Sequence, residues 1–296
     1  MRFRFFSRLY ILVFSLMSIV SCQKESPLVV SEPGTNVFYQ LPQGNHPYDD
    51  EIVEFYKNYN CFILYKFSEA DYNYNWTASV TTTLSVESAD TMYISDALKY
   101  LHRNLFDIYP KQFLKETMPF SILLASKIKI GEVQKDINMI SDYSAISSLR
   151  SLSFGLVNDS LRTLTGSELD SSRGWLHMAY WNLLIKNNML PIADGFQDLA
   201  LNATKATDAV VRANPHKYGV LPPTLLTAYL QQNDYITDFL GYIQVITSTD
   251  STSFANTWLV PSVDINGLYR KKYDLIVNYY KDKYGVDLQA IGDVKN

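Results

Sequence analysis

The stretch Gly174-Trp-Leu-His-Met-Ala-Tyr-Trp-Asn-Leu-Leu184 decides the fold, because its apolar residues recur at the spacing of a helix. Positions i, i+3, i+4, i+7 and i+8 of one helical face are filled by Leu176, Ala179, Tyr180, Leu183 and Leu184. This period predicts one amphipathic helix over about 167–188. His177 and Trp181 lie four residues apart, so they share a face of that helix.

His177 and Trp181 have the spacing at which two histidines bind zinc in the helical H-E-x-x-H motif. Met178 stands at the position of the general base in that motif, and Trp181 stands at the position of the second histidine. A histidine on an amphipathic helix is more often a packed structural residue than a metal ligand. The stretch alone therefore favours a structural role for His177.

The N-terminus has the pattern of a bacterial secretory signal. Three arginines within the first eight residues precede an apolar run over 9–19, which is short for a transmembrane helix. The run ends in small residues before Cys22 and resembles a lipobox, which implies cleavage before Cys22 and attachment of lipid to it. The alternative is an ordinary secretory signal that happens to contain a cysteine. More than one acyl chain on Cys22 would anchor the protein stably to a membrane.

Three segments follow from these features: a lipoprotein signal peptide over 1–21, a tether over 22–45 and one domain over 46–296. The tether is rich in Pro, Ser, Gly and Asn. Gln23 rather than Asp follows Cys22, which resembles the sorting pattern of lipoproteins sent to the outer membrane of a Gram-negative bacterium. The short charged segment after Cys22 is also compatible with display at the cell surface.

The composition sets limits on the partners of the mature chain. Three of the 26 basic residues lie in the signal, so 23 basic and 30 acidic residues leave a net charge of −7. An acidic chain is not expected to bind nucleic acid. The 22 tyrosines suit core packing as well as contact with carbohydrate or peptide, so their number alone decides nothing. Cys61 has no partner once Cys22 is lipidated, so we expect a buried thiol and no disulfide.

Strands are predicted only in the first half of the chain, over 61–67, 76–86, 120–130 and, as a strand or a hairpin, 143–157. Helices are predicted before the central stretch at 49–59, 90–108 and 111–117, and after it at 192–202, 233–246 and 265–285, with a loop at 214–223. This segregation predicts an α+β fold. We expect a mixed sheet in the N-terminal half with helices packed on it, and an all-helical C-terminal half.

The order of these parts resembles the zinc-binding metallopeptidase lipoproteins that are encoded with TonB-dependent glycan or nutrient importers, also called substrate import-associated zinc metallohydrolase lipoproteins. The resemblance is one of layout, over about 49–287, and it implies a zincin-like domain. Its most specific matches are the segments 237–239 and 279–288. In that family an Asp-Phe-Ala-Glu pattern supplies an acidic third zinc ligand, and here the same segment reads Asp-Phe-Leu-Gly over 238–241.

The residues depart from that family where its chemistry takes place. A zinc hydrolase needs three protein ligands, an open position for water and a base beside that water. Trp181 cannot bind zinc, Met178 cannot accept a proton, and Gly241 has no side chain. Only His177 remains, together with Asp238 if a degenerate site persists. We therefore expect no zinc cofactor and no catalytic residues.

These departures predict a pseudoenzyme: a non-catalytic relative that serves as an accessory or binding component of a TonB-dependent uptake system for glycans or peptides. Its expected partners are the membrane, through the lipid on Cys22, and a TonB-dependent transporter with its companion lipoproteins. We expect a remaining cleft to be lined by His177, Tyr180, Trp181 and Asp238.

The alternative is an active zinc-dependent hydrolase with rearranged ligands, namely His177, Asp238 and His216. The remaining histidines, His46 and His102, are predicted to be surface residues.

Overall fold

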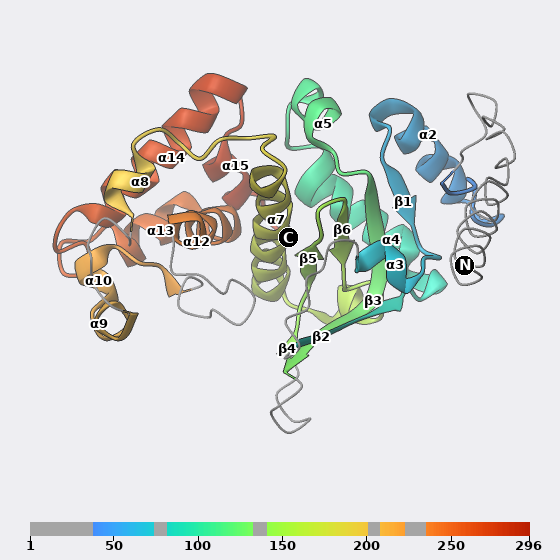
Figure 1. Cartoon of the computed structure of the whole chain (residues 1–296), viewed down its shortest axis with the longest axis horizontal. Helices are drawn as coiled ribbons and strands as arrows, with labels where there is room; N and C mark the ends of the chain where they lie inside the picture. The colour runs from blue at the N-terminus through green and yellow to red at the C-terminus, as the bar shows by residue number, and fades with distance from the viewer. Residues whose placement is uncertain (1–37, 74–81, 133–140, 201–207, 223–234) are drawn as a thin grey trace, which may run out of the picture. The chain divides into compact units, whose positions relative to one another are not determined.

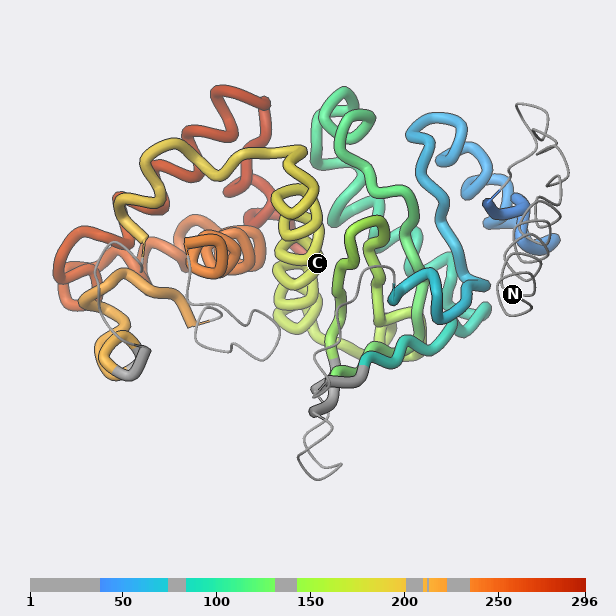
Figure 2. Tube along the Cα trace, in the orientation of Figure 1, coloured from blue at the N-terminus to red at the C-terminus, as the bar shows by residue number. Residues whose placement is uncertain are grey.

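The computed structural model describes residues 38–73, 82–132, 141–200, 208–222 and 235–296. Figure 2 traces these parts of the chain in colour. The predicted signal peptide, Cys22 and most of the predicted tether lie outside them. Internal contacts divide the chain after Gln40, and all elements named below belong to the unit 41–296. None of the described helices is long and apolar enough to cross a membrane.

β3 (Ser121–Glu132) organises the six-stranded mixed sheet. The other strands are β1 (Phe62–Leu64), β2 (Thr82–Ser88), β4 (Ser141–Asp142), β5 (Ala145–Ser147) and β6 (Ser151–Phe154). The first half of β3 pairs in parallel with β1 and β6, and its second half pairs antiparallel with β2 and β4. β5 pairs antiparallel with β6. The described residues contain no strand after Phe154, as predicted.

β3 contributes to two separate cores along its length. Ile122 and Leu124 belong to the main core, which continues through the helices. Ile128 and Ile130 pack with Val86 of β2 in a second, smaller core. A register shift at the end of β2 lies where the strand pair passes from one core to the other.

The helices before the central stretch follow the sequence pattern closely. They are α2 (Asp49–Tyr59), α3 (Glu69–Tyr72), α4 (Ile94–Leu101) and α5 (Lys111–Thr117). The predicted bounds of α2 and α5 are confirmed. The predicted helix over 90–108 is present as three consecutive helical elements: a 3₁₀ turn (Thr91–Tyr93) precedes α4, and a π turn (His102–Phe106) follows it.

The second half of the described chain is helical. Its elements are α6 (Ser160–Thr163), α7 (Gly166–Lys186), α8 (Phe196–Leu199), α9 (Asp208–Ala213), α10 (Pro215–Tyr218), α12 (Tyr235–Ser248), α13 (Ser251–Trp258), α14 (Leu268–Tyr284) and α15 (Leu288–Gly292). The segment predicted as a loop at 214–223 contains α10, because Pro215 occupies the first helical position, where its missing N–H costs nothing. The described part of the predicted helix over 192–202 contains α8, and α6, α9, α13 and α15 were not predicted.

α7 stands between the sheet and the C-terminal helices (Figure 1). Thr165 and Glu168 close a capping box at its N-terminus, as the capping pattern requires. Every residue over 176–184 is buried, so the predicted one-sided apolar stripe is wrong: the helix is covered by strands on one side and by α12 on the other. Gly174 permits the close crossing, since a Cβ there would lie 2.6 Å from the carbonyl oxygen of Gln244.

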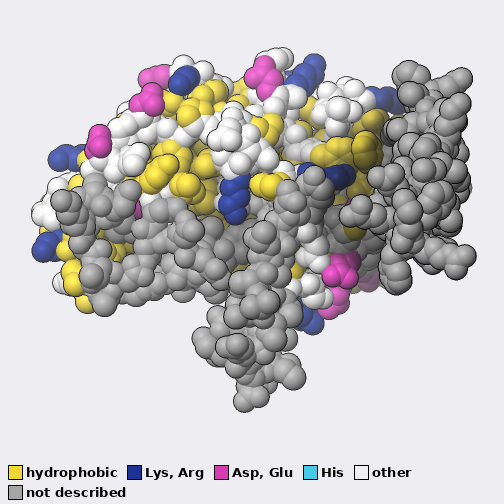
Figure 3. Space-filling view, in the orientation of Figure 1, with side chains coloured by type: hydrophobic (Ala, Val, Ile, Leu, Met, Phe, Trp, Pro, Cys, Tyr) yellow, Lys and Arg dark blue, Asp and Glu magenta, His cyan; other side chains and the backbone are white. Residues whose placement is uncertain are grey.

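The domain also begins earlier than its predicted start at His46. The amide of Gln43 accepts hydrogen bonds from the backbone N–H groups of Tyr65 and Lys66 and donates to the carbonyl of Lys66. These bonds attach the end of the predicted tether to the segment that follows β1. The described side chains on the face seen in Figure 3 include both acidic and basic groups, without a large area of one sign.

Candidate functional site

One face of α7 carries Arg173, His177 and Trp181, each four residues from the next. All three side chains are fully buried, and all three bond to the segment over 104–109. This segment begins inside the π turn, whose wider winding leaves carbonyl groups without their usual helical partners. This face of α7 therefore meets backbone and side-chain polar groups of the same domain.

His177 uses both ring nitrogens in protein contacts. Nε2 lies 2.8 Å from the carbonyl oxygen of Asn104, and Nδ1 lies 2.8 Å from the hydroxyl of Tyr109. A carbonyl only accepts, so Nε2 carries the proton and Nδ1 accepts from Tyr109. The Tyr109 oxygen in turn accepts a bond of 2.8 Å from Nε1 of Trp181. Each hydrogen-bond donor in this series, on Trp181, Tyr109 and His177, therefore has an acceptor.

Burial keeps this imidazole neutral. The side chain is fully buried, and desolvation lowers the pKa of His177 to about 3 against its ordinary value of 6.5. The bond to Asn104 acts in the opposite direction, but the loss of hydration is the larger effect. Burial also raises the pKa of Tyr109 well above its ordinary value, so the phenol keeps the proton that it donates.

The residues present do not fit a zinc ion. A ligating histidine offers a nitrogen lone pair to the metal, and the only lone pair of neutral His177 points at the Tyr109 hydroxyl. Trp181 fills the neighbouring volume, with its ring centroid 4.5 Å from that of Tyr280 and 6.0 Å from that of Phe239. Met178 is buried and apolar. The described residues form no ligand set around His177.

Arg173 continues the same polar network toward the end of the chain. Its guanidinium donates to the side-chain oxygen of Asn104 and to the backbone carbonyls of Thr247, Gly292 and Val294. The network thus joins α7, the π turn, the end of α12 and the C-terminal segment. Such a fully bonded buried network fixes one arrangement of the elements around it.

Asp238 belongs to a different cluster. Its Oδ2 accepts from Nζ of Lys272 at 2.6 Å, and both side chains are fully buried. Lys272 also donates to the carbonyls of Tyr218 and Gly219, and Tyr242 donates its hydroxyl to Gly219. This ion pair connects α12 and α14 to the segment that contains α10.

The rearranged ligand set of the alternative prediction is not brought together. His177 bonds to Tyr109, Asp238 bonds to Lys272, and the exposed His216 lies 3.3 Å from the hydroxyl of Tyr269. The described parts of the chain contain no group of three or more His, Cys, Asp or Glu residues placed to hold a metal ion.

The other two histidines lie toward the surface, as predicted. His46 is exposed and stacks on Tyr48. His102 lies between Glu51 and Asp107.

The predicted cleft lined by His177, Tyr180, Trp181 and Asp238 is wrong for the described structure. All four side chains are fully buried. The hydroxyl of Tyr180, for example, bonds to Thr117 of α5 inside the core. The physical reason is that strands cover α7 on one side and α12 covers it on the other, so these residues lie in the interior.

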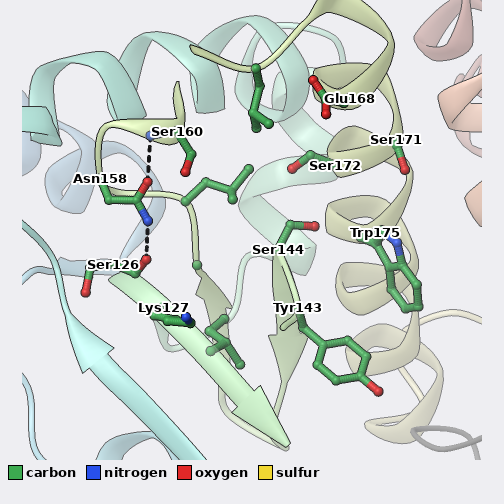
Figure 4. A pocket seen from close by; sticks show the side chains of 14 residues that line it. Ser126, Lys127, Tyr143, Ser144, Asn158, Ser160, Glu168, Ser171, Ser172 and Trp175 are labelled. Carbon is green, nitrogen blue, oxygen red and sulfur yellow. Dashed lines mark hydrogen bonds between the residues drawn. The ribbon is translucent and has the colours of Figure 1, made fainter. Parts of the chain in front are cut away.

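A surface pocket of about 400 Å³ lies closer to the N-terminus of α7. Its wall includes Trp175 and Tyr143, whose rings meet edge to face at 5.6 Å and 86°. Figure 4 shows these two rings at one end of the pocket and Asn158 with Ser126 at the other. The sequence reasoning missed this site, although Trp175 is part of the central stretch, because its partners come from distant segments.

No family model and no curated protein matches this chain by sequence. Its fold resembles that of a solved protein. That protein, from Bacteroides caccae ATCC 43185, is described as a "putative zinc-binding metallo-peptidase". The TM-score is 0.51 at 14% sequence identity, over 83% of this chain and 89% of that chain.

This likeness shows the fold alone, because the sequence identity is low. It agrees with the α+β class that the structure confirms, with a mixed sheet and a helical C-terminal part. Function has to be argued from the residues of this chain.

Proposed function

We propose that this protein is an outer-membrane lipoprotein that keeps a metallopeptidase-like fold without zinc catalysis. In this proposal it acts as a binding or accessory component of a TonB-dependent uptake system for glycans or peptides. The observation that supports the non-catalytic part is the bonding of His177, whose two ring nitrogens are both held by protein groups in a fully buried site.

The position of Met178 and Trp181 supports the same conclusion. A zinc-bound water needs a base within hydrogen-bonding distance, and a thioether is no base. An active site also needs access for its substrate, whereas this part of α7 is covered on both sides. Restoring chemistry here would require new side chains and a new opening.

Zinc analysis tests the non-catalytic part directly. We expect far less than one zinc per chain in the full-length protein purified in detergent without chelator, and no hydrolysis of casein with or without added zinc. About one zinc per chain, lost on chelation together with a peptidase activity, would overturn the proposal.

The anchor is tested by fatty-acid labelling of Cys22→Ala. The thiol of Cys22 is the expected attachment point, so the variant should lose both the label and its partition into membranes. Cys61→Ala is the matched control, because Cys61 is the other cysteine and is buried in the core. A labelled, membrane-bound Cys22→Ala protein would show that the lipobox interpretation is wrong.

A further inference from the structure

The pocket beside Trp175 has the size of a ligand site. Its volume of about 400 Å³ lies in the range of roughly 300–1,000 Å³ that is typical of small-molecule pockets. It is bounded by the N-terminal half of α7, by β3 near 126–128, and by the segments 143–144 and 155–160 (Figure 4). Its walls therefore come from β3, from α7 and from the segments that connect the strands to each other and to α7.

An aromatic surface forms one end of the pocket. Trp175 is only half-buried, unlike Trp181 on another side of the same helix, which is fully buried. The rings of Tyr143 and Trp175 lie at 86° to each other, with their centroids 5.6 Å apart. The face of an indole carries negative charge density, which attracts the C–H groups on one face of a pyranose ring.

Polar groups line the remainder of the pocket. The side chain of Asn158 is fixed, since it donates to the carbonyl of Ser126 and accepts from the backbone N–H of Ser160. Ser144 also lines the pocket, and its buried hydroxyl has no hydrogen-bond partner in the described structure. Hydroxyl and amide groups both donate and accept, as sugar hydroxyls do.

Glu168 adds a fixed carboxylate at the rim. Its Oε2 is held by the backbone N–H and the hydroxyl of Thr165 at 2.8 and 2.7 Å, in the capping box of α7. These bonds lower the pKa of Glu168, so it stays an acceptor. One basic side chain, Lys127, also lines the pocket, so the charges of its lining balance. A balanced lining favours a neutral ligand over an anion or a cation.

The floor of the pocket is rigid. Gly155 allows the segments 143–144 and 155–160 to approach closely, because a Cβ there would lie 2.7 Å from the carbonyl of Tyr143 and 2.8 Å from Ile128. The backbone N–H of Gly155 also donates to the carbonyl of Ser144. A preformed site loses little conformational entropy on binding.

We propose that this pocket binds one end of a neutral oligosaccharide, with a pyranose ring on Trp175 and its hydroxyls toward Asn158, Ser126 and Glu168. This inference rests on the proposed binding role and names its ligand class and its site. Such a pocket offers one aromatic ring for stacking and several hydrogen-bonding groups for hydroxyls. A peptide would be recognised by a longer groove or by charged groups that match the charges of the peptide.

The test uses saturation-transfer NMR on the full-length chain in detergent. The probes are maltotriose, cellotriose, mannotriose and xylotriose, with a tryptic digest of casein as the peptide probe. We expect at least one trisaccharide to receive saturation at the C–H protons of one ring, and the digest to receive none that depends on Trp175. Trp175→Ala should weaken trisaccharide binding at least tenfold, and Trp175→Phe should weaken it less.

Trp258→Phe is the matched control, because Trp258 is also half-buried but packs on Tyr269 outside the pocket. It should bind the trisaccharide like the unmodified chain. Ser171→Gln, which adds bulk at an exposed position of the pocket lining, is a second route if Trp175→Ala fails to fold. The inference is overturned if no trisaccharide binds, if Trp175→Phe and Trp175→Ala both bind as the unmodified chain does, or if only the casein digest binds. Zinc content and peptidase activity are measured on the same preparation. They test the proposed non-catalytic role independently of oligosaccharide binding in this pocket.

Discussion

The hydroxyl of Tyr109 lies 2.8 Å from Nδ1 of His177, and this bond occupies the only lone pair that the imidazole has. Tyr109 follows the π turn, and His177 lies 68 residues further along the chain. The same hydroxyl accepts from Trp181 at 2.8 Å. A polar side chain from outside α7 thus satisfies the two residues that stand at the histidine positions of the zinc motif.

Tyr109→Phe is expected to destabilise the protein by about 2–5 kcal/mol, because it leaves two buried groups, Trp181 Nε1 and His177 Nδ1, without a partner. Urea unfolding followed by circular dichroism measures the change. Tyr180→Phe is the control, since Tyr180 is equally buried but its hydroxyl bonds only to Thr117, which also donates to a backbone carbonyl. We expect a loss of about 1 kcal/mol there. Equal losses in the two variants would contradict this account.

His177→Gln is expected to flatten the acid dependence of stability. The folded chain keeps His177 neutral down to about pH 3, whereas the unfolded chain binds a proton near pH 6.5. The unfolded state therefore binds more protons between these values, and stability falls by about 1.4 kcal/mol for each pH unit below 6.5. Glutamine does not titrate, although its amide can donate to Asn104 and accept from Tyr109.

The measurement is urea unfolding of both proteins at pH 7.5 and 4.5. We expect the stability difference between the unmodified chain and His177→Gln to narrow by about 2–3 kcal/mol at the lower pH. Parallel pH curves would show that the buried imidazole does not control this dependence.

Lys272→Met is expected to cost about 3–5 kcal/mol, because it removes the cation from a fully buried carboxylate. The double change Lys272→Met with Asp238→Asn should recover part of that loss, since the buried charge is then gone. Urea unfolding of the unmodified chain, the single variant and the double variant gives the comparison. A double variant less stable than Lys272→Met would rule out the ion pair as the cause.

The sequence was enough to predict the fold class but only part of each element's environment. The helix at 49–59 and the helix at 111–117 have the bounds that their apolar period and Pro110 predict. The period of α7 was visible too. Its burial on both sides was not, because periodicity reports one apolar stripe and cannot show that Arg173 and His177 find buried partners.

The sequence could not predict which residues of other segments contact α7. A π turn has no clear sequence signature, so the Asn104 carbonyl that accepts from His177 could not be foreseen. Trp175 was visible inside the central stretch, but its contact with Tyr143 depends on how the sheet meets the helix. Residue identity alone thus showed that the zinc motif is incomplete and gave no indication of the pocket nearby.

Restoring the zinc motif tests whether the bond between Tyr109 and His177 controls metal binding. Met178→Glu, Trp181→His and Gly241→Glu together supply a base and two ligands at the positions of the resembling family, and Trp181→His alone is expected to bind no zinc. In the triple variant the His177 lone pair still faces Tyr109, so we expect zinc affinity to rise at least tenfold more when Tyr109→Phe is added. Asn104 would then accept from Nε2 and orient the ring, as outer partners of metal-bound histidines do.

Zinc titration with a competing chelator measures each step, and circular dichroism checks that each variant folds. Stoichiometric zinc in Trp181→His alone, or equal affinity with Tyr109 and Phe at this position, would disprove the controlling role of the Tyr109 hydroxyl.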